Sequence, residues 1–154
     1  MPTIKQTIEF IRAAHAGQTD KGGQPYWQHP VAVMRRLGPS ASKAEKLTAL
    51  LHDVIEDTGT TADDLRRLCY PEDVIAAVVL LSRPQGVHYL DWIRSIAESG
   101  NRMAIRVKIA DNEHNSDPSR VTALPPDQRG LVKRYEQSLR ILRQAPCMKG
   151  QQRT

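Results

Sequence analysis

The chain has 154 residues, enough for one domain with its own core, and its formal net charge of +5 comes from 22 Lys and Arg against 17 Asp and Glu. Hydrophobic residues make up 40% of the chain and aromatic residues only 5%, so we expect a mainly aliphatic core. The basic residues form no long run, no helix-turn-helix pattern and no interleaving with aromatic residues. This disfavours a nucleic-acid-binding protein and fits a polyanionic small-molecule ligand.

Cysteine usage and hydropathy bear on the cellular compartment. Cys69 and Cys147 are isolated and form no CxxC motif, which is typical of a reducing cytoplasm and not of a disulfide framework. The N-terminus lacks the apolar core of a signal peptide, and no apolar run approaches 18 residues. We therefore expect a soluble cytoplasmic protein with no membrane segment.

Apolar residues recur at a spacing near four along most of the chain, which predicts helices. In the first half, the predicted helices are one capped by Thr3 that runs to about His15, one from Pro30 to Leu37, one opened by Ser40 or Ser42 that ends near residues 58–59, and one capped by Thr60 or Thr61. In the second half they cover residues 74–81 after Pro71, 89–97, 105–115 and 127–145. The valine-rich stretch at 74–81 could form a buried strand, but its spacing and the lack of a partner strand favour a helix.

Polar segments rich in Gly and Pro separate these helices. We predict loops at residues 17–28 and 83–88 and an irregular stretch between Pro118 and Pro126. The overall prediction is a compact all-α fold with a single domain at residues 1–146 and a polar, frayed tail at 147–154.

Residues 50–58 are the most informative segment for function. On a helix with about 100° per residue, His52, Asp53, Glu56 and Asp57 fall within an arc of about 140°, opposite a leucine- and valine-rich face. Three carboxylates so close repel each other unless a cation or solvent relieves the repulsion. A solvated acidic face would explain the acids but not the His–Asp pair among apolar residues, so a metal site and a solvated face remain as alternatives.

Two further residues could complete a metal site. His29 lies in a turn-like stretch between two prolines, and Asp111 lies at the polar end of an apolar run. Taken singly, each has an ordinary explanation as a turn or element-ending residue. Together with His52 and Asp53 they form a mixed nitrogen and oxygen set, which suits Mn, Fe, Zn or Ni and argues against a structural zinc site.

This pattern of His, His-Asp and Asp resembles the HD phosphohydrolase superfamily. The wider match, over roughly residues 5–145, is to the hydrolase domain of RelA/SpoT homologues. The residues that carry it are Ala14-His15-Ala16-Gly17-Gln18, Lys21, Gly23-Gln24-Pro25-Tyr26, His29-Pro30, His52-Asp53, Glu56-Asp57-Thr58, Val107-Lys108-Ile109-Ala110-Asp111 and Asn115. The chain is too short for a synthetase or regulatory domain beside this one, so it resembles a stand-alone small alarmone hydrolase.

The resemblance implies an all-α HD fold and an enzyme that removes the 3′-pyrophosphate from (p)ppGpp-type nucleotides with Mn²⁺. It implies His29, His52, Asp53 and Asp111 as metal ligands. It also implies that Glu56 and Asp57 orient or deprotonate the attacking water or protonate the leaving group.

The resemblance also implies contacts to a small-molecule nucleotide substrate. Lys21 and Asn115 match residues that lie near the nucleotide in the family. Tyr135 on the last helix could stack against the ligand or serve as a core tyrosine, and both alternatives stay open. Lys108, Lys133 and Arg134 are candidate phosphate contacts or ordinary surface charges.

Two positions depart from the family pattern. The (p)ppGpp-specific members usually carry Arg-Lys where this chain has Asp20-Lys21, and they commonly carry Arg where this chain has Asn112. Guanine presents acceptors at O6 and N7, which an ionised Asp20 would repel, whereas adenine presents an N6 amino donor. We therefore expect faster cleavage of (p)ppApp than of (p)ppGpp.

Three alternatives remain open from the sequence. One is an HD phosphohydrolase of another nucleotide, such as a 5′-nucleotidase or triphosphohydrolase, but the loop motif and the Glu56-Asp57-Thr58 run count against it. Another is a sensor that binds a nucleotide without hydrolysis, against which the intact ligand set argues. A nucleic-acid-binding protein comes last.

Overall fold

Helices form nearly all of the structure. The computed structural model describes residues 1–149, and within that range the only β-type pairing is an isolated bridge between Thr19 and Pro25. The helices are α1 (Ile4–Ala14), α2 (Gln28–Arg36), α3 (Lys43–Leu51), α4 (Val54–Asp57), α5 (Ala62–Arg67), α6 (Glu72–Leu80), α7 (Tyr89–Glu98), α8 (Arg102–Asn115), α9 (Pro118–Ala123), the 3₁₀-helix η1 (Pro126–Gln128), α10 (Leu131–Arg143) and α11 (Pro146–Lys149).

Local capping sets where three of these helices begin. The caps are Thr3 for α1, Ser42 for α3 and Thr61 for α5. In each case the hydroxyl accepts the backbone N–H three residues on, and the Gln, Glu or Asp at that position accepts the N–H of the cap residue. Two of these helices each had two candidate caps in the sequence. The structure uses Ser42 and not Ser40 to begin α3, and Thr61 and not Thr60 to begin α5.

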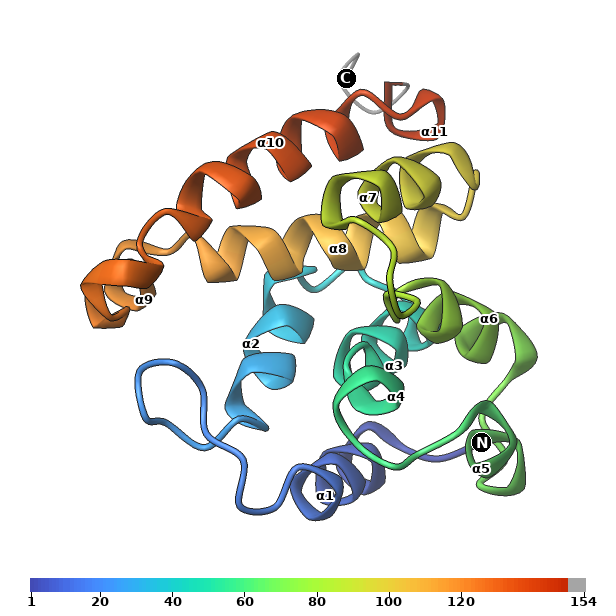
Figure 1. The fold of residues 1–154 in the computed structure, drawn as a ribbon. Helices are drawn as coiled ribbons and strands as arrows, with labels where there is room; N and C mark the ends of the chain where they lie inside the picture. The colour runs from blue at the N-terminus through green and yellow to red at the C-terminus, as the bar shows by residue number, and fades with distance from the viewer. Residues whose placement is uncertain (150–154) are drawn as a thin grey trace.

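α8 lies at the centre of the molecule. α10 and α7 pack on one side of it, and α2 and α3 pack on the other (Figure 1). One cluster of buried aliphatic side chains joins α7, α8 and α10 around Ile93, Ile105 and Leu142. A second cluster joins α1, α3 and α6 around Ile11 and Leu50. The predicted single all-α domain with an aliphatic core is confirmed.

The predicted single helix through the metal-ligand segment is wrong. α3 ends and α4 begins on either side of a turn made by His52 and Asp53. In a continuous helix the carbonyl oxygen of Ala49 would accept the N–H of Asp53; in the structure it accepts a hydrogen bond from Nδ1 of His52 at 2.6 Å. His52 is therefore buried, while Glu56 and Asp57 are exposed, and the four side chains do not share one helical face.

The stretch predicted to be irregular contains a short helix. α9 begins with Pro118 at its first position, where the missing N–H costs nothing, and Asp117 caps it by accepting the N–H of Ser119. The predicted last helix is divided into η1 and α10 by Arg129 and Gly130. Other boundaries shift by a few residues: α2 begins two residues before Pro30, and α8 begins at Arg102.

The predicted frayed tail begins with an ordered turn. α11 brings Cys147 and Met148 against the first core cluster. The rest of the predicted tail, residues 150–154, lies outside the described residues. Among the helices of the described part, none has both the length and the apolarity needed to cross a bilayer.

Candidate metal centre and cleft

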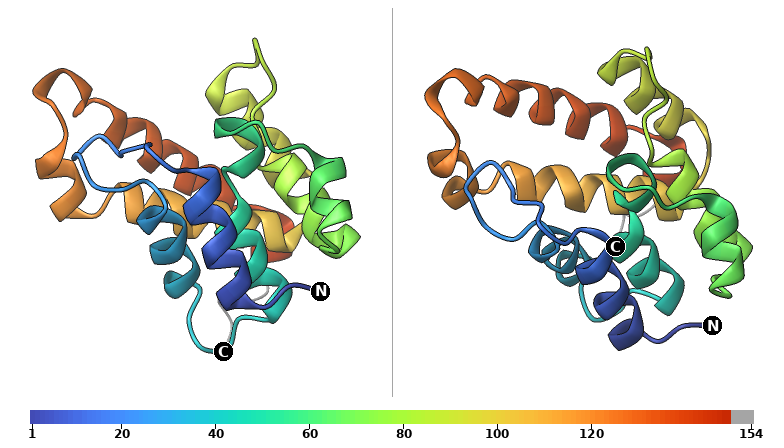
Figure 2. Two further views of the ribbon diagram at one scale, coloured as in Figure 1. Left: turned by 90° about the horizontal axis from the view of Figure 1, so that it is seen from below. Right: turned by 60° about the horizontal axis from the view of Figure 1, so that its bottom comes forward.

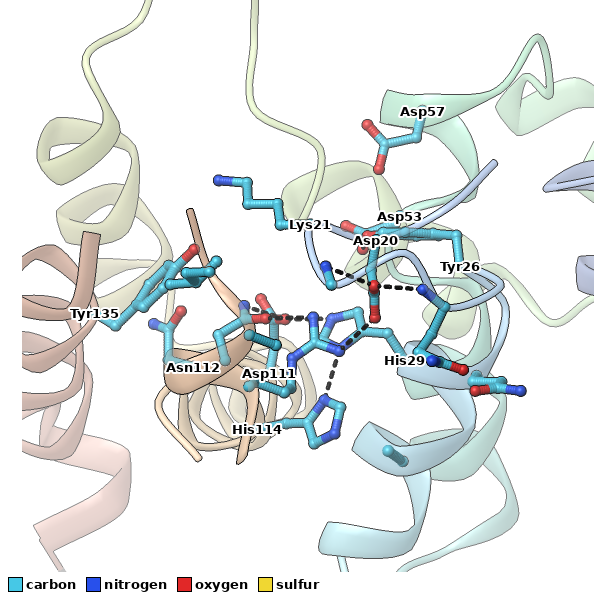
Figure 3. Close-up of a pocket in the computed structure, with 18 of the residues that line it drawn as sticks. Asp20, Lys21, Tyr26, His29, Asp53, Asp57, Asp111, Asn112, His114 and Tyr135 are labelled. Atoms are coloured by element: carbon cyan, nitrogen blue, oxygen red, sulfur yellow. Dashed lines mark hydrogen bonds and ion pairs between the residues drawn. The ribbon is translucent and has the colours of Figure 1, made fainter. Parts of the chain in front are cut away.

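An open cleft of about 850 Å³ lies between the 17–28 loop, α4, α8, α9 and the start of α10. Its volume is typical of small-molecule sites. Apart from His52 and Lys133, the predicted site residues all line this cleft, and His52 is buried in contact with residues that do. Figure 3 shows these side chains arriving from both sides of the cleft. The fold thus assembles in one place a set of residues that the sequence spreads over more than a hundred positions.

The four predicted metal ligands converge at one end of the cleft. Nε2 of His29 on α2 lies 2.8 Å from Oδ1 of Asp111 on α8. Nε2 of His52 lies 3.5 Å from the same oxygen and 3.0 Å from Oδ2 of Asp53. His29, His52 and Asp53 each offer a ligand atom within 4.8 Å of the others. Two imidazole nitrogens and two carboxylates therefore face a common point.

The ring of His52 shows that this cluster fits a cation. Its Nδ1 faces the carbonyl oxygen of Ala49, an acceptor, so Nδ1 must carry a proton. In the neutral ring Nε2 is then a bare lone pair, and it is buried with no hydrogen-bond partner among the described residues despite its closeness to Asp53 and Asp111. Burial by itself would lower the pKa of His52, but these two carboxylates hold it well above its usual value. A proton or a metal ion satisfies the same demand for positive charge.

A second layer of side chains holds the ligating carboxylates. The hydroxyl of Tyr26 donates a hydrogen bond to Asp53. Nζ of Lys108 lies 2.7 Å from Oδ2 of Asp111, and Nδ2 of Asn115 donates to Oδ1 of Asp111 at 3.1 Å. Burial would raise the pKa of Asp111, but Lys108 and the nearby histidines hold it well below its usual value, so this carboxylate is ionised. Support of this kind orients ligands and is a regular part of metal sites.

Glu56 and Asp57 lie beside the cluster, on the cleft side of α4. Oε1 of Glu56 accepts the backbone N–H of Arg83 at 2.6 Å, which ties α4 to the loop before α7. The carboxylate of Asp57 lies near Asp53, and the three acids of this segment offer ligand atoms within 4.8 Å of one another. Partial desolvation, and then the charges of Asp53 and Glu56, raise the pKa of Asp57 to about 6. A carboxyl with such a pKa can exchange protons near neutral pH.

Asp20 is not a free carboxylate in the structure. Its Oδ1 accepts the backbone N–H groups of Gly22 and Gln24, each at 2.9 Å, and so shapes the loop. Its Oδ2 accepts a hydrogen bond from Nη1 of Arg120 on α9 at 3.1 Å. Figure 2 shows the loop lying beside α9. Arg120 therefore brings a positive charge to the position where the family pattern suggested that one had been lost.

Two predicted substrate contacts and the departure at Asn112 also belong to the cleft. Tyr135 and Lys21 line the cleft, and the pKa of Lys21 is lowered by partial burial and by Arg134. Asn112 is buried and bonds to Tyr89 and Ser138, so it joins α8 to α7 and α10, and it also lines the cleft.

Of the three candidate phosphate contacts, two lie in the cleft. Lys108 and Arg134 line the cleft, whereas Lys133 is exposed outside it. The guanidinium of Arg134 lies 4.1 Å from the ring centre of Tyr89, a cation–π contact that holds it in place. Arg83 also lines the cleft and lies 5.8 Å from the same ring.

Sequence reasoning assigned no role to four residues of this site. Tyr26 ends the motif at residues 23–26 and bonds to Asp53. His114 directly precedes Asn115 and bonds to His29. No sequence pattern points to Arg83 or Arg120, since each comes from a loop or short helix whose position depends on packing. His114 is half-buried, and burial, followed by His29, Arg120 and Arg36, lowers its pKa to about 4.

Comparison with known proteins relates this geometry to a family. No family model matches the chain. The chain is 35% identical over 141 residues to the bifunctional (p)ppGpp synthase/hydrolase SpoT of Escherichia coli. The matched segment covers 85% of this chain and 20% of that protein. The chain is also 34% identical over 124 residues to a GTP pyrophosphokinase of Myxococcus xanthus. This match covers 73% of this chain and 16% of that protein. The predicted resemblance to the RelA/SpoT hydrolase domain is confirmed.

The fold of this RelA/SpoT-type domain is also found among solved structures. A metazoan ortholog of SpoT that hydrolyses ppGpp matches with a TM-score of 0.76, over 94% of this chain and 89% of that chain, at 22% identity. The chain spans about a fifth of the length of the first curated relatives it matches. The likeness to the RelA/SpoT type therefore extends over nearly the whole helical fold and not over one motif alone.

Proposed function

We propose that this chain is a cytoplasmic Mn²⁺-dependent 3′-pyrophosphohydrolase of alarmone nucleotides, which releases pyrophosphate from the ribose 3′ position of (p)ppGpp or (p)ppApp. The observation that carries the proposal is the buried lone pair of His52, which meets His29, Asp53 and Asp111 at the wall of an open cleft. The names of relatives support the substrate, since one from Escherichia coli O157:H7 is a guanosine-3′,5′-bis(diphosphate) 3′-pyrophosphohydrolase.

The proposed metal ligands are His29, His52, Asp53 and Asp111. Their mixed nitrogen and oxygen donors suit Mn²⁺. A divalent cation bound there would supply Lewis acidity, which lowers the pKa of water and neutralises phosphoryl charge. The hydrogen bonds of the second layer keep the carboxylates ionised and oriented toward that position.

Glu56 and Asp57 are the proposed catalytic residues. The pKa of Asp57 is raised to about 6, so it is the better candidate to take a proton from the attacking water and return it to the leaving group. Glu56 is anchored to the N–H of Arg83, which fixes the direction of its second oxygen. It is the better candidate to orient the water.

Positive side chains on the cleft wall are the proposed phosphate contacts. Lys21, Arg83 and Arg134 line the cleft, and no carboxylate within the described residues forms a salt bridge with any of them. Tyr135 lies among them, where its ring can pack against the nucleotide. Such a wall offsets the charge of a polyphosphorylated ligand and holds it for reaction.

The proposed base preference depends on Asp20 and Arg120 together. Oδ2 of Asp20 keeps capacity for one more donor, such as the N6 amino group of adenine. The paired Arg120 offers donors that O6 and N7 of guanine could accept. We still expect (p)ppApp to be the preferred substrate, because Asp20 keeps its negative charge beside Arg120. Oδ1 of Asp20 is occupied by the N–H groups of the loop, so Oδ2 is the oxygen that would meet the base.

The test is a parallel assay of metal-stripped protein, with Mn²⁺ restored, on ppGpp and ppApp, with pyrophosphate release as the readout. We expect cleavage that is lost in His52→Ala and in Glu56→Gln, while the matched controls His88→Ala and Glu9→Gln keep wild-type rates, because both control residues are exposed and outside the cleft. Tight binding of both nucleotides without pyrophosphate release would contradict the enzyme and favour a sensor. Cleavage of other nucleotides alone would favour a different HD phosphohydrolase.

A further inference from the structure

A pair of histidines lies at the edge of the proposed metal centre. Nδ1 of His29 and Nδ1 of His114 are 2.8 Å apart, a hydrogen-bond distance. The two ring planes differ by only 22°, and the ring centres are 5.0 Å apart, so the two nitrogens lie between rings that meet edge to edge. In the close-up, His114 lies on the far side of the cluster from Asp57 (Figure 3). This residue is therefore remote from the proposed catalytic acids.

Counting protons on this pair identifies a donor and an acceptor. A neutral imidazole carries one N–H and one lone pair. Nε2 of His29 faces the metal position, 2.8 Å from Oδ1 of Asp111, so a metal-binding His29 must present its lone pair there. The proton of His29 must then be on Nδ1, and within the described residues the hydrogen-bond partner of this Nδ1 is His114. Nδ1 of His114 must accept.

The surroundings of His114 favour this acceptor role. Arg36 and Arg120 both place positive charge near its ring, and Asp111 is the acid that faces it. Arg36 is itself held in place by Asp117 at 3.1 Å. A proton on Nδ1 of His114 would leave two N–H groups facing each other across the 2.8 Å between the rings.

We propose that His114 is a positioning residue for the metal centre: its Nδ1 accepts the Nδ1–H of His29 and holds His29 in the tautomer that presents the Nε2 lone pair to the metal. The proposal rests on the proposed metal centre. Hydrogen bonds of this kind to the second ring nitrogen are known to fix tautomer and orientation in histidine ligands, and their loss typically costs 10- to 100-fold in metal affinity.

The test compares two substitutions of similar size. His114→Asn keeps an acceptor oxygen at the position of Nδ1, whereas His114→Leu removes it. We expect His114→Leu to weaken Mn²⁺ binding by about 10- to 100-fold in calorimetric titration, and His114→Asn to stay within about threefold of wild type. His88→Leu serves as the matched control, since His88 is exposed and away from the cleft. Circular dichroism and thermal melting of the metal-free proteins establish that each variant is folded.

A second readout needs no substitution. Long-range ¹H–¹⁵N spectra of the wild-type protein loaded with diamagnetic Zn²⁺ report which nitrogen of each histidine carries a proton. We expect the proton of His29 on Nδ1 and a bare Nδ1 on His114. A bare Nδ1 on His29, or unchanged Mn²⁺ affinity in a folded His114→Leu protein, would overturn this proposal and leave the metal centre standing. Failure of the wild-type protein to bind Mn²⁺ would overturn the metal centre and this proposal together.

Discussion

The Asp20–Arg120 ion pair allows the sharpest test of base recognition. Asp20→Asn is the most selective perturbation, because the amide keeps Oδ1 for the N–H groups of Gly22 and Gln24 and so keeps the loop. It removes the negative charge that faces Arg120 at 3.1 Å and supplies an amide donor in place of one carboxylate oxygen. Asp20→Arg is less informative, since it also deletes both loop acceptors and places a second cation beside Arg120.

The size of the effect follows from the contacts of Asp20. A hydrogen bond to a charged partner contributes about 1.5–3 kcal/mol, but exposed pairs contribute roughly 0–1 kcal/mol. The side chains of Asp20 and Arg120 are 12% and 25% exposed, which is between these cases, so we take about 1 kcal/mol, equivalent to about fivefold in rate. In Asp20→Asn, O6 of guanine gains an amide donor and the N6 amino group of adenine loses a charged acceptor. Both changes raise ppGpp turnover relative to ppApp turnover.

The assay measures kcat/KM for ppGpp and ppApp in the same preparation of each variant. We expect Asp20→Asn to raise the ratio of ppGpp to ppApp turnover at least about fivefold. Asp127→Asn is the matched control, because Asp127 is exposed and outside the cleft. An unchanged ratio in Asp20→Asn would refute the reasoning and would leave Asp20 as a loop-forming residue that does not reach the base.

Three further predictions follow from the metal centre and its acids. Glu56→Gln and Asp57→Asn should each lower kcat by about 10²- to 10⁴-fold while Mn²⁺ affinity by calorimetry changes little, and a comparable loss of affinity would show that these acids are ligands instead. Mn²⁺ affinity should rise with pH, because the raised pKa of His52 means that the metal must displace a proton; affinity independent of pH between 5.5 and 8 would contradict this. Folding raises the pKa of Asp57 to about 6, so its protonated form stabilises the native state at low pH and this contribution is lost as pH rises through 6. Metal-free Asp57→Asn should therefore be more stable than wild type above pH 6, by about 1 kcal/mol after allowance for its exposure, in urea unfolding.

Much of the fold could be predicted from the sequence because it depends on neighbours within one helical turn. The caps Thr3, Ser42 and Thr61 each have a side chain three residues on that completes a capping box, and such pairs form wherever the chain lies. The four proposed ligands could also be chosen in advance, because their types and order match a family pattern. The turn at His52–Asp53 could not be predicted, since apolar spacing continues through it and only packing buries His52.

The sequence by itself thus determined the helical class of the fold, most of the helices and the identity of the chemical groups. Tertiary structure decided which groups meet. His29 contacts Asp111 across 82 residues, and Asp20 contacts Arg120 across 100 residues. Both contacts exist because α8 packs against α2 and brings α9 beside the 17–28 loop. Helix formation is governed by hydrogen bonds four residues apart, whereas these pairings depend on how whole helices bury their apolar faces, and no local pattern records that arrangement.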